Sequence, residues 1–326
     1  LSMCIAEEIH VAIEHIDLKD KSGEEQDAVI ADIRHAEVAT AFDLRFGPLL
    51  RAKLALLDTE RAILFVSFHH LVVDGWTLDL LLKELAEFYS AFIEKRDVNL
   101  PRAFQFSQYA EWIGDAYTTP EAAEADEYWL GEFEQKAPTL ELPLDKHRPS
   151  VRSYSAARVE QPIEGDAAQR IFDAATKQKS TFFIYAFAAY VAFIHRLTGL
   201  EDIVIAVPAA GHLDVGENQL SGHCVNTLPN RVQVDGKMTL DDLQKAVRNK
   251  VYAGYGHTPF TYSLLMGRVP MDRDMSRPPL ASLIMTVDQE SHELPFSGLE
   301  SCYRLSPRAY EMFELQVSLV SERKDY

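Results

Sequence analysis

The chain has little of several residues and motifs that commonly carry chemistry. Of its 326 residues only three are cysteine, Cys4, Cys224 and Cys302, and no pair has the spacing of a metal site or a redox motif. One cysteine would remain after any disulfide, which favours free, mostly buried thiols in a reducing cytoplasm. The sequence also has no Gly-x-Ser-x-Gly elbow, phosphate-binding loop or Cys-x-x-Cys motif. Because no nucleophile is marked, direct transfer between two bound substrates is favoured over a covalent enzyme intermediate.

Basic residues and long apolar runs are scarce as well. There are 32 Lys and Arg against 50 Asp and Glu, a net charge of −18, which disfavours nucleic acid as a partner. The longest apolar run, Thr181–Ile194, is shorter than the ~20 residues that a membrane helix needs. We interpret it as a buried core helix capped by Ser180 or Thr181. The first twenty residues lack the basic head and apolar block of a signal peptide. We therefore expect no membrane partner.

Strand-like and helical segments alternate along the whole chain. Hydrophobic residues make up 47% and charged residues 25%, as is typical of globular proteins. This length and pattern predict an α/β or α+β fold of two domains. A proline-containing stretch without periodicity, 140–151, predicts the boundary, which gives domains 1–149 and 150–326. The main predicted strands are 62–70, 153–163, 202–210, 225–234 with a break at Pro229, 280–288 and 313–320. The predicted helices are 76–92, 106–117, 122–135, 166–178, 181–194 and 239–256.

One stretch, "VSFHHLVVDGW" (66–76), combines two histidines, an aspartate and a glycine. The strand that leads into it is apolar on both faces, which predicts a central strand covered on both sides. The helix that follows has Thr77 as a candidate N-cap. If the strand continues through the pair, His69 and His70 point to opposite faces, which argues against a shared metal ion. We predict no metal site.

Two interpretations of this stretch remain open on the residues alone. In one, His69 is a satisfied core residue and Asp74 caps the following helix. In the other, a neutral histidine at a strand end is a general base, which Asp74 orients, and Gly75 lets a substrate approach the backbone. The second interpretation indicates a transferase or hydrolase with a histidine base.

The segment "HHLVVDGW" resembles the His-His-x-x-x-Asp-Gly signature of condensation domains in nonribosomal peptide synthetases. His-x-x-x-Asp-Gly also marks acyltransferases that use coenzyme A thioesters. Further segments, however, resemble blocks of the condensation family in the family's order, and together they cover nearly the whole chain. These segments are "FDLRFGPLLRAKL", "FSQYAEWI", "YWLGEF…LELPLDKHRP", "HRLTGLEDIVIAVPAAG", "SGHCVNTLPNRV" and "RDMSRPPLASLIMTV". Two short segments, "GHTPFTYSLL" and "GHCVN", favour a hybrid polyketide–peptide assembly line.

This resemblance implies a fold and a reaction. The fold would be two lobes, each like chloramphenicol acetyltransferase, in a V-shaped pseudo-dimer with a tunnel between them, here apparently truncated at both ends. An upstream carrier protein would deliver an acyl or peptidyl thioester, and a downstream carrier an aminoacyl group whose amine forms the amide. Both substrates would arrive on 4'-phosphopantetheine arms, so no cofactor is expected on the domain itself. A neighbouring adenylation domain would be a further partner.

The resemblance also assigns roles at the motif. His70 matches the family's second histidine, which would take a proton from the attacking amine or hold the amine and the tetrahedral intermediate by hydrogen bonds. Asp74 would hold the loop. Gly75 would leave room for substrate and offer its N–H to the developing oxyanion.

Three more residues are candidate substrate contacts. His69 would mainly shape the end of the strand, and Trp76 ends the motif segment. Asn226, in "VNTLPNR", would support the tunnel from the second lobe; a turn-stabilising asparagine is the alternative.

The chain departs from the family pattern at two positions. His212 stands where the family usually has an arginine that pairs with the motif's aspartate, which leaves Asp74 with another cation or with none. Pro278 stands where a polar residue near the tunnel is frequent. These departures keep a second class of function open, a non-catalytic module that recruits carriers or a tailoring enzyme. Epimerisation and ester-forming domains share the histidine motif and are the enzymatic alternatives.

Overall fold

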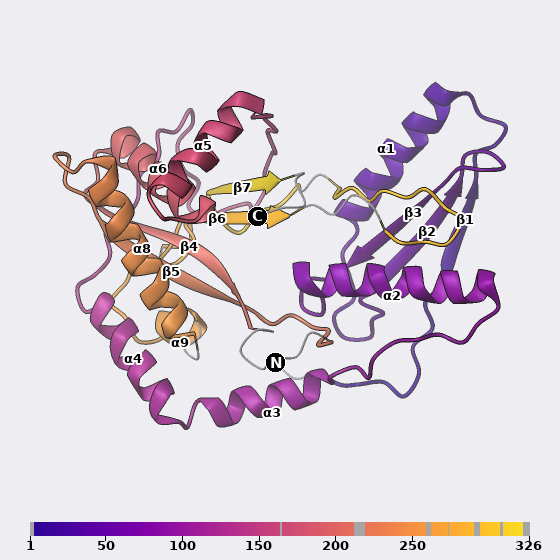
Figure 1. The fold of residues 1–326 in the computed structure, drawn as a ribbon, viewed down its shortest axis with the longest axis horizontal. Helices are drawn as coiled ribbons and strands as arrows, with labels where there is room; N and C mark the ends of the chain where they lie inside the picture. Colours follow the sequence, from indigo (N-terminus) through magenta and orange to yellow (C-terminus); the bar gives the residue numbers. More distant parts are fainter. Residues whose placement is uncertain are drawn as a thin grey trace.

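The computed structural model describes residues 3–163, 165–211, 219–258, 262–272, 274–289, 294–306 and 309–321. These residues form two lobes, each with its own β-sheet, that lie beside one another in Figure 1. Both lobes mix strands and helices, so the predicted α/β class is confirmed.

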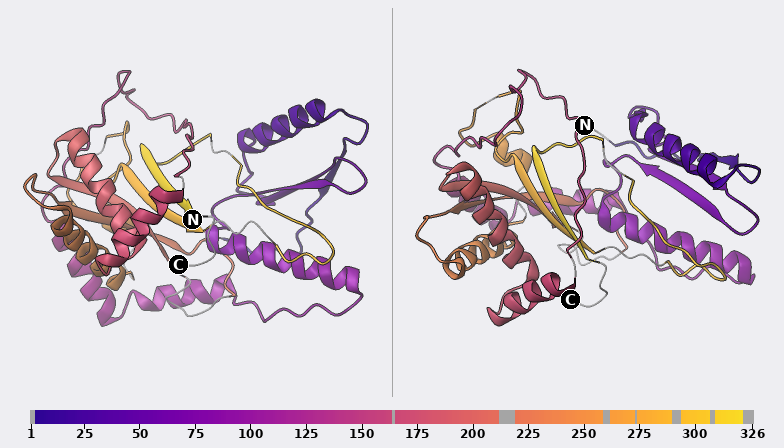
Figure 2. Two further views of the ribbon diagram at one scale, coloured as in Figure 1. Left: turned by 45° about the horizontal axis from the view of Figure 1, so that its top comes forward. Right: turned by 90° about the horizontal axis from the view of Figure 1, so that it is seen from above.

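The first lobe is built on a three-stranded sheet with the order β1-β2-β3. Strands β1 and β2 are parallel and are joined through helix α1, while β2 and β3 are antiparallel. Helices α1 and α2 lie beside this sheet (Figures 1 and 2). The bounds are β1 Ile13–Asp17, α1 Gly23–Ala39, β2 Leu50–Leu56, β3 Ala62–Phe68 and α2 Gly75–Glu94.

The second lobe is built on a four-stranded sheet with the order β5-β4-β6-β7. Strand β5 is antiparallel to β4, whereas β4 pairs with β6, and β6 with β7, in parallel. The bounds are α3 Phe106–Ala116, α4 Pro120–Glu132, α5 Gly165–Lys177, α6 Phe182–Thr198, β4 Asp202–Ala210, β5 Val225–Gln233, α8 Leu240–Gly256, α9 Tyr262–Met266, β6 Leu283–Gln289 and β7 Leu315–Ser321.

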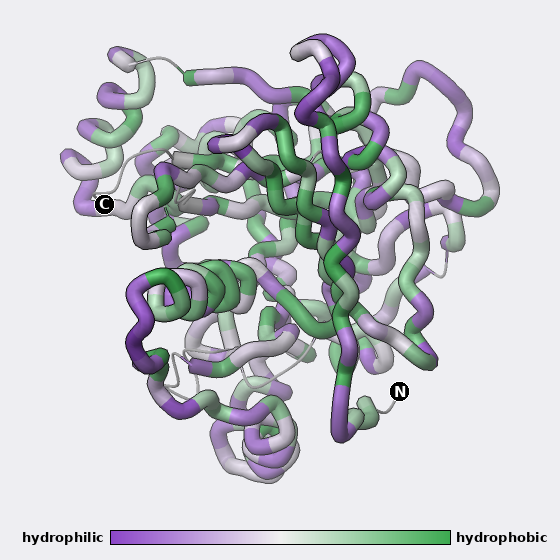
Figure 3. The backbone as a smooth tube through the Cα atoms, turned by 90° about the vertical axis from the view of Figure 1, so that its right-hand side faces the viewer, coloured by the Kyte–Doolittle hydropathy of each residue, from purple (hydrophilic) through white to green (hydrophobic). Residues whose placement is uncertain are grey.

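Hydrophobic layers cover both faces of this second sheet. On one face, α6 and α8 pack against Ile203, Ile205 and Val207 of β4. On the other face, α4 and α9 pack against Val204 and Ala206 of the same strand. The alternation follows from the period of two along a strand. Hydrophobic segments accordingly gather inside the molecule and hydrophilic ones along its outer turns (Figure 3).

Helix α4 belongs by its packing to the second sheet. Its Trp129 and the adjoining Phe133 are almost fully buried in the core that contains β4 and β6. The predicted division at residue 149 stays a prediction, but the residues on its N-terminal side include a helix that packs on the other lobe. Conversely, a segment C-terminal to residue 149 packs on the first lobe. Ser297 N–H donates to Ser90 Oγ on α2 at 2.8 Å, so residues near 297 lie along the first lobe.

Most helices start where a short polar side chain caps them. Thr119, Thr181 and Thr239 are N-caps of α4, α6 and α8, so the predicted cap at Thr181 is confirmed. The predicted cap of α2 at Thr77 is wrong, because Asp74 lies three residues earlier and accepts from the Thr77 N–H. Asp74 therefore has the capping role of the first interpretation.

Three further predictions about strands are corrected by the structure. β3 lies at an edge of its sheet as far as the described residues show, and Leu64 is 42% exposed, so β3 is not a covered central strand. The doubly covered strand is β4. Residues 153–163 make only an isolated bridge, between Ser155 and Tyr310. Strand β5 runs through Pro229 without a break, since it is an edge strand among the described residues and a missing N–H is tolerated there.

The cysteines are free, as predicted, but they are not mostly buried. Cys224 is buried, whereas Cys4 and Cys302 are exposed. Among the described residues, no single helix is long and apolar enough to cross a membrane; by length and composition alone, α5 and α6 could do so as a pair bent by 104°.

Candidate active site

The two histidines of the motif lie just beyond the end of β3. The strand ends at Phe68, and the backbone N–H of His69 donates to the Leu49 carbonyl at 3.0 Å. His70 lies in the turn that follows, so strand alternation does not decide where its ring points.

The His69 ring is held within the first lobe. Its Nδ1 accepts from the Leu71 N–H at 3.1 Å, which places the ring proton on Nε2 when the ring is neutral. The ring also makes an edge contact with Phe42, with centroids 5.8 Å apart. His69 is half-buried, and these contacts give it a part in the shape of the strand end.

The His70 side chain is exposed and lies against a histidine from the other lobe. The His70 and His223 rings are perpendicular, with centroids 4.9 Å apart. The ring is thus open to solvent, as a group that exchanges protons with a substrate must be.

Asp74 is a buried carboxylate that joins the motif loop to the second lobe. It is 2% exposed. Its Oδ1 accepts from the Thr77 N–H, and its Oδ2 accepts from the Cys224 N–H, both at 2.9 Å. The arginine partner usual in the resemblance is His212 here, which lies outside the described residues. Among the described residues, the carboxylate accepts from one backbone N–H group of each lobe.

A second bridge between the lobes lies one helical turn further along. The Thr77 hydroxyl donates to the Gly222 carbonyl at 2.8 Å and accepts from the Gly222 N–H at 3.0 Å. Thr77 is fully buried, so both bonds are shielded from water. Together with Asp74, Thr77 fixes residues 222–224 on the first turn of α2.

Aromatic side chains of α3 pack against residues 220–224. Tyr109 packs with Leu220 and Cys224, and Phe106 borders the same cluster. A Cβ at Gly222 would lie 2.2 Å from the Phe106 ring, and one at Gly211 would lie 2.3 Å from the Cys224 carbonyl. Glycine is therefore required at both positions, because the neighbouring groups occupy the space of a side chain.

His223 is a residue of the site that the sequence analysis missed. Burial lowers the pKa of its imidazole, and neighbouring His70 lowers it further, while Asp74 raises it. The side chain retains solvent contact, and the lowered pKa favours the neutral ring. The sequence did contain a hint of His223, because the segment "GHCVN" places a histidine directly after Gly222 in a stretch that resembles a family block.

Gly75 and Trp76 form the exposed start of α2. A Cβ at Gly75 would meet no atom within 4 Å, so the packing of the protein itself does not require glycine there. Trp76 is 39% exposed. Both residues stand beside Asp74 at the positive end of the helix dipole, where developing negative charge is stabilised.

Asn226 serves local structure at the start of β5. Its Nδ2 donates to the Thr258 carbonyl at 3.1 Å, and its Oδ1 accepts from the Thr227 N–H at 2.8 Å. These bonds support the alternative in which Asn226 stabilises the neighbouring turns. A contact with substrate stays a prediction.

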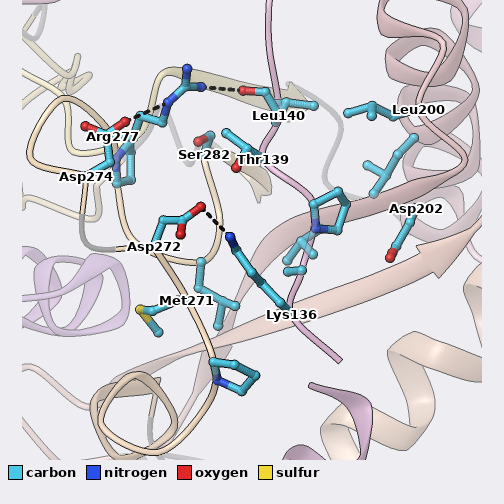
Figure 4. Close-up of a pocket in the computed structure, with 17 residues that line it drawn as sticks. Lys136, Thr139, Leu140, Leu200, Asp202, Met271, Asp272, Asp274, Arg277 and Ser282 are labelled. Atoms are coloured by element: carbon cyan, nitrogen blue, oxygen red, sulfur yellow. Dashed lines mark hydrogen bonds and ion pairs between the residues drawn. The ribbon is translucent and has the colours of Figure 1, made fainter. Parts of the chain in front are cut away.

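The cavity in Figure 4 lies elsewhere, in the second lobe between residues 136–140, the start of β4 and residues 270–272 and 274–282. Pro278 lines it, whereas none of the six predicted site residues does. Its charged side chains are paired: Lys136 binds Asp272 at 2.6 Å, and Arg277 binds Asp274 at 3.1 Å. Within the described ranges, no three His, Cys, Asp or Glu side chains group in a way that could hold a metal ion.

Comparison with known proteins identifies the family. The Condensation domain family matches residues 2–325. The chain belongs to this family. One of the plipastatin synthases of Bacillus subtilis (strain 168) is 33% identical over 265 residues, which cover 78% of this chain and 10% of that protein. The condensation-domain chain thus spans about a tenth of the length of this curated relative.

Solved structures share the fold of this condensation domain. The first condensation domain of the calcium-dependent antibiotic synthetase, in complex with a substrate analogue, has a TM-score of 0.73 at 21% identity, over 94% of this chain and 66% of that one. The X-domain from teicoplanin biosynthesis has a TM-score of 0.80 at 20% identity, over 99% of this chain and 72% of that one. At such identities these likenesses show the fold, and they confirm the predicted acetyltransferase-like architecture.

Proposed function

We propose that this condensation domain forms an amide bond between two carrier-bound substrates in the cytoplasm. The donor is an acyl or peptidyl thioester on an upstream carrier, and the acceptor is an aminoacyl group on a downstream carrier. The observation that carries the proposal is the exposed imidazole of His70, on a loop whose aspartate is bonded to both lobes. A buried imidazole could not meet a substrate, and a loose loop would not hold one in place.

The reaction needs few groups from the protein. The acceptor nitrogen bonds to the thioester carbonyl carbon, the C–S bond breaks, and the pantetheine thiol of the upstream carrier leaves. His70 accepts the proton that the amine loses and returns it to the leaving thiolate. The first turn of α2, with Gly75 at its start, faces its positive end toward the developing oxyanion. The pantetheine arms belong to the substrates, and no separate cofactor takes part.

Substrate alignment and general-base catalysis by His70 contribute different amounts to the rate. Holding two tethered substrates in line can lower the barrier by ~7–11 kcal/mol, whereas one general base contributes about 10²–10⁴-fold. Loss of His70 should therefore remove most of the turnover and leave a residual rate from alignment.

His70→Ala tests this function. The protein is incubated with upstream carriers that bear acetyl, octanoyl or aminoacyl groups and with downstream carriers that bear each proteinogenic amino acid. Mass spectrometry follows the product on the downstream carrier. We expect amide formation by the wild type and a rate lower by about 10²–10⁴-fold in His70→Ala, with carrier binding unchanged.

His35→Ala is the matched control, since His35 is an exposed histidine of the same lobe on α1. Turnover by His70→Ala at the wild-type rate would refute the role of the imidazole. An inverted stereocentre without chain growth would indicate epimerisation, and an ester product the ester-forming class. Carrier binding without turnover of any pair would indicate a recruiting module.

A further inference from the structure

The ring of His70 meets a second imidazole that the other lobe supplies. The perpendicular arrangement of the His70 and His223 rings, at 4.9 Å, is one that aromatic pairs favour. Both side chains are exposed, so the pair lies at a surface that a substrate can reach rather than within the core.

The His223 backbone is fixed on both sides by the element that follows His70. Before it, Gly222 shares two hydrogen bonds with Thr77; after it, the Cys224 N–H donates to Asp74 at 2.9 Å. Asp74 is the N-cap of α2, and Thr77 is in the first turn of that helix. The placement of His223 beside His70 is therefore built into the junction of the lobes.

The charge state of His223 suits a packing role. Because the lowered pKa of His223 favours its neutral ring, that ring can lie against His70 without charge repulsion whether His70 carries a proton or not. The His70 ring can then change protonation during turnover while its neighbour stays in place.

We propose that His223 is a positioning residue for His70, whose ring it holds in the orientation that serves the transfer reaction. This inference rests on the proposed function for its catalytic consequence. The ring contact itself makes no use of the carriers, so it can be tested without them.

The first measurement uses no substrate. Protein with ¹³C-labelled histidine is studied by NMR, with His70→Gln and His223→Ala used to assign the two ring signals. We expect a nuclear Overhauser contact between the rings, and one sharp Cε1–H signal for His70. In His223→Ala that signal should shift and broaden, and in His223→Phe it should sharpen again because a ring is restored. An unchanged His70 signal in His223→Ala overturns the inference.

The second measurement is the rate of amide formation with the donor and acceptor pair that the carrier panel identifies. Misplacement of a reacting group by about 1 Å can cost up to about 10²-fold. We expect His223→Ala to lower kcat by about 10- to 100-fold with KM within about twofold, and His223→Phe to recover most of kcat. A role of His223 confined to fold stability would not lower kcat of the folded protein.

His195→Ala is the control for loss of a second-lobe imidazole. His195 lies on α6 and its Nδ1 bonds the Leu200 carbonyl at 2.7 Å, outside the site. Urea unfolding of each variant confirms that it is folded. Equal kcat values for His223→Ala and His195→Ala, or no recovery in His223→Phe, overturn the positioning role. If the wild type forms no amide with any pair, the proposed function fails, and the NMR measurement still decides the ring contact.

Discussion

At the scale of single residues, Asp74 has the most constrained chemistry in the site. Its two oxygens each accept an N–H, one from Thr77 in its own lobe and one from Cys224 in the other. A substitution that replaces either carboxylate oxygen with a hydrogen-bond donor should destabilise the fold, because the new donor would face a backbone N–H at close range.

Asp74→Asn should therefore lower the free energy of unfolding by about 1–3 kcal/mol, since its amide group would place a donor against the Thr77 or Cys224 N–H. Urea unfolding measures this change, and the rate of amide formation should fall with it because the same loop holds His70. Asp126→Asn is the control, since that carboxylate pairs with Arg268 away from the motif. An Asp74→Asn protein as stable as wild type would contradict the bridging role.

The sequence indicated the motif residues but not their geometry. His70, Asp74 and Gly75 were predictable as a group because they occur within six positions of one another. The neighbour of His70 was not, because His223 comes close only through a bridge made by backbone atoms of Gly222 and Cys224. Backbone hydrogen bonds do not require particular side chains, so they cannot be recognised in the sequence. Gly222 is the exception, because the Phe106 ring leaves no room for a side chain there.

At the scale of elements, the end of α2 carries a compact ion pair. Arg96 binds Glu87 at 2.8 Å, and Glu87 also accepts the Asn99 N–H at 2.9 Å. The Arg96 hydrogen bond, with that of Asn99, lowers the pKa of Glu87 to about 2. These contacts fold the chain back on the helix just after its left-handed C-cap residue, Lys95.

The direction of this pKa shift predicts how stability depends on pH. The folded-state pKa of Glu87, about 2, lies below the ordinary value of 4.5, so its contribution is present above pH 4.5 and is lost as pH falls toward 2. Urea unfolding of wild type and Glu87→Gln should show a difference in stability that narrows over this window. Glu84→Gln, on the same helix but outside the Arg96 pair, is the control variant. A difference that stays constant from pH 6 to pH 3 would argue against the pair.

Prediction succeeded for elements whose pattern and packing agree. The apolar run at Thr181 forms the core helix α6, as predicted, with Phe187 and Val191 fully buried. Prediction failed for the place of a strand within its sheet, because an apolar sequence does not specify which strands pair with it. β3 has as apolar a sequence as β4, but its position in the sheet depends on pairing with β2, which the pattern of β3 alone does not specify.

At the scale of the whole molecule, the lobes meet at the first turn of α2. The Thr77 hydroxyl is the best place to test that junction, because valine has the same shape without the hydrogen-bonding group. Thr77→Val leaves the buried N–H and C=O of Gly222 without their hydroxyl partner, at a cost of about 1–3 kcal/mol for each group.

We expect Thr77→Val to lower the free energy of unfolding and to speed hydrogen exchange at the Gly222 amide, which NMR can follow. Thr77→Ser keeps the hydroxyl and should stay close to wild type in both measurements. Unchanged exchange at Gly222 in Thr77→Val would mean that the hydroxyl does not hold the lobes together.

The junction also bears on how such domains can be recombined. A chimera cut between the lobes would take Asp74 and Thr77 from one parent and residues 222–224 from the other. The hydrogen bonds that Asp74 and Thr77 make with residues 222–224 reach main-chain atoms, so these bonds would re-form with a second half of different sequence that keeps the glycine. The contact between His70 and His223 joins two side chains and would be lost unless the parent of the second half carries an aromatic ring at that position. A hybrid of this kind could assemble normally and still turn over slowly.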